Sequence, residues 1–205
     1  MKLKKILAVM MAGAMMLSMA ACGGEETTTA ESTGEQKTID GNVLDAEQYF
    51  NGYLSSEPTT LDSVTGNDTY SSSILTNAME PLTRLAEKDG ENVREGAAAE
   101  SWESNEDGTV WTFHLRDNKW SDGQPVTAND YVYAITRVLT PETGSPNSWL
   151  LTCVKNANAV LAGEMDPSEL GVKAVDDKTI EFTLESPTPY FLALTDTRVM
   201  MPQRQ

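Results

Sequence analysis

The residue types that most often carry out chemistry are scarce in this chain. The 205 residues include two cysteines, Cys22 and Cys153, and one histidine, His114. A Cys–His catalytic pair or a His-rich metal site needs more such side chains than one histidine can supply. No Gly-x-Ser-x-Gly motif is present for an acyl-transfer nucleophile. We therefore expect no catalytic site, no metal and no cofactor, and we interpret His114 as structural.

Cys22 stands at the end of a segment that is typical of an export signal. A basic start with Lys2, Lys4 and Lys5 precedes residues 6–21, which are apolar or small and carry no charge. This run is shorter than the ~20 apolar residues of a spanning helix. Its last residues, Leu17-Ser-Met-Ala-Ala-Cys22, resemble the lipobox of bacterial lipoproteins, in which the cysteine becomes a lipid-bearing N-terminus.

We accordingly expect residues 1–21 to be a lipoprotein signal peptide and Cys22 to be lipidated. The alternative is an ordinary secretory signal with an incidental cysteine. With Cys22 so explained, Cys153 is a lone thiol in an apolar stretch, which is more often a small core residue than a nucleophile. Residues 23–37 contain no large apolar side chain, so burial cannot offset the entropy of ordering them. We expect residues 22–45 to be a disordered tether.

The chain is strongly acidic. Its formal net charge is −16, and removal of Lys2, Lys4 and Lys5 with the signal would make it −19. Such a surface repels phosphate backbones, so we expect no nucleic-acid partner. It also disfavours electrostatic docking on anionic lipid, and its simplest role is solubility.

Residue patterns predict the elements of the folded part. An aromatic run over residues 48–54 indicates a strand, and apolar positions at helical spacing indicate a helix that Thr69 or Ser71 caps and that runs to about residue 79. Residues 82–85 are a short strand candidate, with a turn at Asp89-Gly90. Residues 97–102 predict a helical turn that leads into a strand.

The clearest pattern lies in residues 105–139. Residues 109–115 alternate, with Trp111 and Phe113 on one face, which predicts a half-buried strand after a turn at residues 105–108. Thr127 and Asp130 form a capping box, and an apolar stripe follows on the same helix. Further elements are expected as two helices over residues 149–154 and 156–161, a capped turn at Asp166, a hairpin over 172–184 and a helix over 190–194.

Several ordered motifs resemble the extracellular solute-binding proteins of family 5, the oligopeptide- and dipeptide-binding components of ATP-driven importers. The motifs are Glu57-Pro-x-x-Leu-Asp62, Gly96 to Trp102, Trp111-Thr-Phe-His-Leu-Arg116, Lys119-Trp-Ser-Asp-Gly-x-Pro-Val-Thr-Ala128, Asp130-Tyr-Val-Tyr133, Thr143-Gly-Ser-Pro146, Leu170-Gly-Val-Lys-Ala174 and Thr183-Leu-Glu-x-Pro-Thr-Pro-Tyr-Phe191. Any one of them is weak, whereas the ordered set is specific.

This resemblance implies an α/β, periplasmic-binding-protein-like fold of type II, with two lobes that close over an extended peptide. Residues 46–205 would form part of the first lobe, with residues 46–68 and 172–205 in a large subdomain and residues 69–171 in a small α+β subdomain. The ligand main chain would pair with protein backbone, as in β-augmentation. The family motif places this pairing at Asn67, Asp68 and Thr69, and a second ligand contact at Asn147.

The resemblance also implies a lipid-anchored, monomeric binding protein on the outer face of the cell membrane, with an oligopeptide ligand, membrane permease subunits as partners and no enzymatic activity. Because family members are considerably longer, we expect the chain to be a fragment or the product of a truncated gene. Three alternatives stay open. They are the same fold with another solute (a nickel complex, haem, an opine or a sugar), a secreted hydrolase, and a structural or adhesive surface protein.

Overall fold

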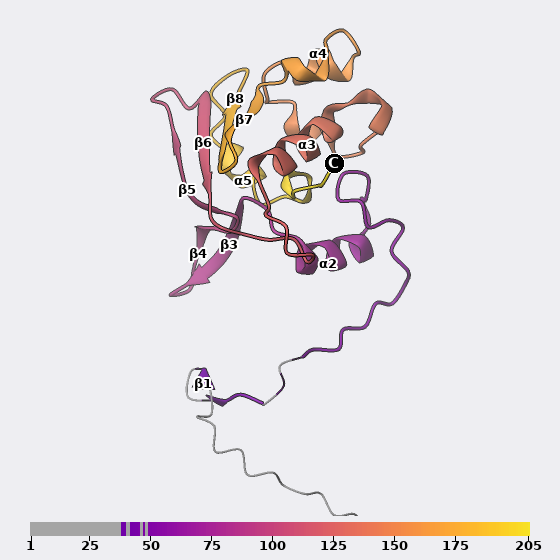
Figure 1. Cartoon of the computed structure of the whole chain (residues 1–205), viewed down its shortest axis with the longest axis vertical. Helices are drawn as coiled ribbons and strands as arrows, with labels where there is room; N and C mark the ends of the chain where they lie inside the picture. The colour runs from indigo at the N-terminus through magenta and orange to yellow at the C-terminus, as the bar shows by residue number, and fades with distance from the viewer. Residues whose placement is uncertain (1–37, 40–41, 46, 48) are drawn as a thin grey trace, which may run out of the picture. The chain divides into compact units, whose positions relative to one another are not determined.

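The computed structural model describes residues 38–39, 42–45, 47 and 49–205, which divide into two units, residues 1–51 and 52–205 (Figure 1). In the first unit, β1 (Thr38–Ile39) pairs antiparallel with β2 (Asn42–Val43), within the segment expected to be a tether. The expected signal peptide and Cys22 lie outside the described residues. None of the helices that the structure describes is long and apolar enough to cross a membrane.

The second unit contains a four-stranded antiparallel sheet. The order across the sheet is β5 (Ala99–Ser104), β6 (Val110–Leu115), β8 (Thr179–Thr183) and β7 (Val172–Asp176). The predicted strand over 109–115 and the predicted hairpin over 172–184 are thereby confirmed. Phe113, Ile180 and Phe182 are fully buried, as the alternating pattern indicated.

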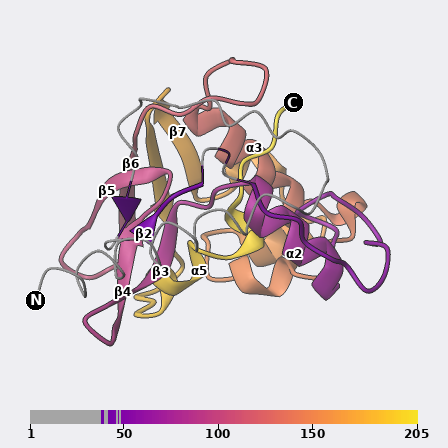
Figure 2. The same cartoon turned by 90° about the horizontal axis from the view of Figure 1, so that it is seen from below.

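The core of this unit lies between the sheet and its helices. Phe191 of α5 (Phe191–Leu194) packs against Phe182 with 5.2 Å between the ring centroids. α3 (Ala128–Leu139) lies beside β7 and β8 in both views (Figures 1 and 2). The predicted capping box begins α3, because the Thr127 N–H donates to Asp130 Oδ2 at 2.8 Å. The apolar stripe of α3 is buried, which orients the helix toward the core.

A separate hairpin joins β3 (Thr83–Lys88) to β4 (Glu91–Gly96). Its turn uses positive φ at Asp89 (53°) and Gly90 (80°), as the Asp-Gly pair predicted. The remaining elements are α2 (Thr69–Ala78), α4 (Ala157–Leu161) and four 3₁₀ turns, η1 (Pro141–Thr143), η2 (Ser148–Leu151), η3 (Pro167–Glu169) and η4 (Arg198–Met200).

Several sequence predictions are wrong. The described part of the aromatic run, residues 49–54, forms no strand, because no described segment pairs with it, and its rings are exposed. Residues 97–102 contain no helical turn, since β5 begins at Ala99 and pairs with β6. The helix expected over 149–154 is only the short η2. The cap of α2 is neither Thr69 nor Ser71 but Asp68, whose carboxylate accepts from the Ser71 N–H.

The expected subdomain boundary between residues 171 and 172 is not a boundary in packing. β6 precedes it and β8 follows it, yet Phe113 of β6 pairs with Ile180 of β8. Both strands contribute to one buried cluster together with α3. Gly171 itself lies close against this sheet, where an added Cβ would stand 2.4 Å from the Thr183 carbonyl oxygen. Residues on both sides of position 171 therefore share one sheet and one core.

Candidate functional site

The predicted ligand-contacting residues Asn67, Asp68 and Thr69 lie at the junction of a loop and α2. The loop turns back on itself, since the Gly66 N–H donates to the Asp62 carbonyl at 2.9 Å. A second contact, in which the Thr59 hydroxyl donates to Asp68 Oδ2 at 2.5 Å, joins the beginning of the loop to its end. Gly66 is buried in this fold, whereas the side chains of Asn67 and Thr69 are exposed. A compact loop thus presents its last residues to solvent.

The Asp68 side chain caps the N-terminus of α2. Its carboxylate accepts from the Ser71 hydroxyl at 2.5 Å and from the Ser71 N–H at 2.8 Å. These bonds from Ser71, followed by the bond from Thr59, hold the pKa of Asp68 well below its usual range. The carboxylate is therefore ionised at neutral pH, and its side chain positions the loop.

Asn147 lies next to this loop in space, which the family motif, used only for a second ligand contact, did not indicate. Its Nδ2 donates to the Gly66 carbonyl at 3.1 Å, and the buried Ser145 hydroxyl donates to the Val64 carbonyl at 2.7 Å. The structure therefore brings all four predicted site residues together. The sequence spacing contains no sign of this contact, because about 80 residues separate the two segments.

The backbone of Asn67 differs from its neighbours. Gly66 has both its N–H and its C=O bonded inside the protein, and the Asp68 carbonyl accepts from the Ser72 N–H at 3.1 Å. Within the described residues, the N–H and C=O of Asn67 bond to no other group. A free donor and a free acceptor on one residue can form one pair of backbone hydrogen bonds with an extended ligand.

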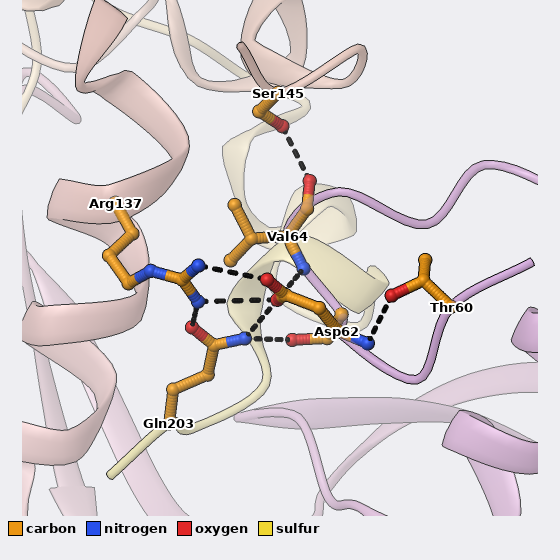
Figure 3. A network of polar contacts seen from close by, with 7 residues as sticks. Thr60, Asp62, Val64, Arg137, Ser145 and Gln203 are labelled. Atoms are coloured by element: carbon orange, nitrogen blue, oxygen red, sulfur yellow. Dashed lines mark hydrogen bonds and ion pairs between the residues drawn. The ribbon is translucent and has the colours of Figure 1, made fainter. Parts of the chain in front are cut away.

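A network of charged and amide groups holds the loop at Asp62, before Asn67 in the chain. Asp62 accepts hydrogen bonds from Arg137 of α3 and from Gln203 (Figure 3). Sequence reasoning missed Arg137 and Gln203, because neither belongs to the motifs that it used for the ligand site.

A cavity of about 660 Å³ among the described residues does not lie at this site. It is an open groove at the C-terminal end of α2, whereas Asn67 to Thr69 lie at the N-terminal end of the same helix. Ten helical residues separate these ends by about 15 Å. The groove has a mixed lining, which includes Met79, Glu80 and Trp120.

Catalytic side chains are not assembled in the described part of the chain. His114 lies on the exposed face of β6, where its Nε2 is 3.2 Å from Glu103 Oε1. Burial raises the pKa of the Cys153 thiol, which disfavours the nucleophilic thiolate. Among the residues that the structure describes, no three His, Cys, Asp or Glu side chains are placed to hold a metal ion.

Comparison with known proteins identifies the family of the chain. The sequence profile of the bacterial extracellular solute-binding proteins, family 5, matches residues 94–202. The periplasmic murein peptide-binding protein MppA of Escherichia coli is 39% identical over 165 residues, which are 79% of this chain and 30% of MppA. The chain belongs to family 5 of the bacterial extracellular solute-binding proteins.

Solved structures show the same fold. The substrate-binding domain of an oligopeptide ABC transporter from Bacillus anthracis superposes with a TM-score of 0.73 at 46% identity, over 78% of this chain and 31% of that one. OppA of Listeria monocytogenes bound to peptide gives a TM-score of 0.68 at 38% identity, over 74% of this chain and 30% of that one.

The fold is therefore α/β and periplasmic-binding-protein-like, of type II, and the chain spans about a third of the length of these relatives. They are solute-binding proteins and not enzymes, so the hydrolase alternative is not supported.

Proposed function

We propose that the complete protein is the lipid-anchored, substrate-binding component of an ATP-driven importer, which captures oligopeptides outside the cell and delivers them to a membrane permease. The names of the relatives, which include a murein peptide-binding protein and a peptide-bound OppA, support a peptide as the ligand. The proposal concerns a whole family member, of which this chain spans about a third.

One observation carries the assignment of the site. The Asn67 backbone has a free N–H and a free C=O within the described structure, and the residues on both sides of it are fixed. A ligand main chain that pairs with the Asn67 backbone would gain backbone hydrogen bonds without regard to its side chains. Such recognition suits a binder of many peptides, because selectivity is left to the surrounding pockets.

The peptide assignment is tested with the complete gene product. Calorimetry with a mixed oligopeptide pool, together with mass spectrometry of co-purified ligands, should show peptide bound to the protein. Absence of any bound or titratable peptide would overturn it. If the two lobes close over ligand, solution scattering should show that the protein becomes more compact when peptide is added; unchanged scattering would contradict closure.

The membrane anchor is a separate part of the proposal, supported by the residues before Cys22. A lipid on Cys22 and a polar spacer would keep a monomeric binding domain near its permease, and stable anchoring takes more than one acyl chain. Cys22→Ser should move the protein from the membrane fraction to the medium and abolish its labelling by radioactive palmitate. Labelling that persists in this variant would exclude Cys22 as the anchor.

A further inference from the structure

Three distant segments meet at the Asp62 carboxylate (Figure 3). Arg137 Nη2 donates to Asp62 Oδ2 at 2.8 Å, and Nη1 donates to Oδ1 at 3.2 Å. Gln203 Nε2 donates to the same Oδ1 at 2.6 Å. A two-point guanidinium–carboxylate pair fixes both the distance and the orientation of its partners, which a single contact does not.

From Asp62 the network continues directly into the candidate ligand-binding loop. The Val64 N–H donates to Asp62 Oδ1 at 3.0 Å, and the Gly66 N–H donates to the Asp62 carbonyl at 2.9 Å. Val64 is fully buried. Asp62 therefore connects Arg137 of α3 to the residue that immediately precedes Asn67.

Gln203 closes the network from a third direction. Its Nε2 also donates to the Ser63 hydroxyl at 3.0 Å, and its Oε1 accepts from Arg137. Its own N–H donates to the Asp130 carbonyl in the first turn of α3, at 3.0 Å. The amide thus bridges the loop and the helix and satisfies donors and acceptors on both.

The network is partly withdrawn from solvent. The side chains of Asp62 and Arg137 are 28% and 31% exposed. Burial alone would raise the pKa of Asp62, but the hydrogen bonds from Arg137, the Val64 N–H and Gln203 outweigh it and lower the pKa below the usual value. Removal of Arg137 would leave a half-buried carboxylate without its cation, so the loop would move to hydrate it.

We infer that Arg137 and Gln203 are positioning residues for ligand binding: they hold Asp62, and through it Val64 and Gly66, so that the Asn67 backbone keeps the place at which a peptide main chain can pair with it. This inference rests on the proposed ligand-binding function of Asn67 to Thr69. Arg137 and Gln203 contact neither the exposed residues Asn67 and Thr69 nor, by this account, the peptide.

Arg94 supplies a matched control for Arg137. Its Nη1 lies 2.8 Å from Asp196 Oδ2, and the two side chains are 18% and 28% exposed. Arg137→Gln and Arg94→Gln each remove the cation of a half-buried ion pair, but only Arg137 is connected to the loop. Peptide affinity is measured by calorimetry on the complete gene product, well below the melting temperature of every variant. Arg137→Lys, which keeps the charge but not the two-point geometry, replaces Arg137→Gln if the latter does not fold.

We expect Arg137→Gln to weaken peptide affinity by about tenfold or more and Arg137→Lys by less, while Arg94→Gln stays within about twofold of wild type. Wild-type affinity in both Arg137 variants would overturn the inference. An equal loss of affinity in Arg94→Gln would overturn it as well, because the effect would then be one of general stability.

Hydrogen exchange without ligand separates this inference from the proposed function. The Val64 and Gly66 amides should exchange at least about tenfold faster in Arg137→Gln than in wild type or Arg94→Gln, because opening of the loop costs less there. If wild type binds no peptide, the proposed function fails, and this exchange pattern still decides whether Arg137 holds the loop. Unchanged exchange at both amides would overturn the positioning role.

Discussion

Asn147 donates a hydrogen bond of 3.1 Å from its Nδ2 to the Gly66 carbonyl oxygen, across 81 positions of the chain. The contact joins the turn that follows α3 to the loop that precedes α2. It gives Asn147 a role that does not depend on touching ligand, because the same bond fixes the residue before Asn67. Among the four residues expected to bind ligand, Asn147 thus supports the backbone that precedes Asn67.

Asn147→Ala removes this support. The lost hydrogen bond should lower the free energy of unfolding by about 1 kcal/mol and weaken peptide affinity by about tenfold. Asn118→Ala is the control, because the Asn118 side chain also makes a long-range bond, to Glu80 at 3.2 Å. Urea unfolding and calorimetry should show similar stability losses in the two variants but weaker binding in Asn147→Ala alone. Equal peptide affinities in Asn147→Ala and Asn118→Ala would contradict the role of Asn147 in supporting the ligand-binding loop.

Gly66→Ala tests the compactness of the loop. An added Cβ would lie 3.2 Å from the Asp62 carbonyl oxygen and 3.3 Å from Thr60 Cγ2, so the loop must shift by a few tenths of an ångström. We expect weaker peptide binding with a stability loss of no more than about 1 kcal/mol.

Gly108→Ala is the matching substitution away from the site. Gly108 has φ +70° and open space around its Cβ position, so alanine there is strained but meets no neighbour. It should cost about 1 kcal/mol of stability and leave peptide affinity unchanged. Peptide binding that is weakened in both glycine variants would indicate a global effect.

The contribution of the Asp62 carboxylate to the free energy of unfolding should decrease in acid. Its pKa is lowered in the folded protein, so the unfolded chain takes up the proton more readily. The stability contributed by the carboxylate is fully present above its ordinary pKa and is lost as pH falls through the lowered folded value.

Asp62→Asn should therefore be less stable than wild type at neutral pH, and the difference should shrink as the pH is lowered from about 5 to about 2. Urea unfolding of both proteins across this range measures the effect. A difference that stays constant or grows with acidification would contradict the proposed ion pair.

The elements that could be predicted from sequence are those whose local pattern agrees with their packing. β6 alternates apolar and polar residues, and α3 carries both its cap and its apolar stripe. β4 was missed because its residues are polar or small and it pairs with β3 alone, so it shows little burial. β5 begins in an alanine-rich stretch that favours a helical turn, and pairing with β6 overrides that local preference.

The candidate site could be predicted only in part. The family motif indicated Asn67 to Thr69 and Asn147, but no sequence signal announces that Asn147 bonds to Gly66. Arg137 and Gln203 are 75 and 141 positions away from Asp62, and their meeting depends on how α3 and the last described segment pack. Such contacts arise from tertiary structure, which a residue pattern does not contain.

His114→Gln tests the expectation that the only histidine is structural. The His114–Glu103 pair is exposed, at 40% and 63% for the two side chains, and such pairs contribute little. We expect a change of less than about 1 kcal/mol in unfolding free energy and no change in peptide affinity. Loss of a hydrolytic activity in this variant would instead revive an enzymatic role.

The most direct test of backbone pairing at Asn67 is hydrogen exchange of the Asn67 amide. The measurement uses the complete gene product with and without a saturating peptide pool. The Asn67 N–H has no partner in the described structure, so it should exchange rapidly in the free protein and at least about tenfold more slowly when a peptide carbonyl accepts from it. If calorimetry shows bound peptide while the Asn67 amide exchanges as fast as in the free protein, the ligand does not pair with the Asn67 backbone and the account is contradicted.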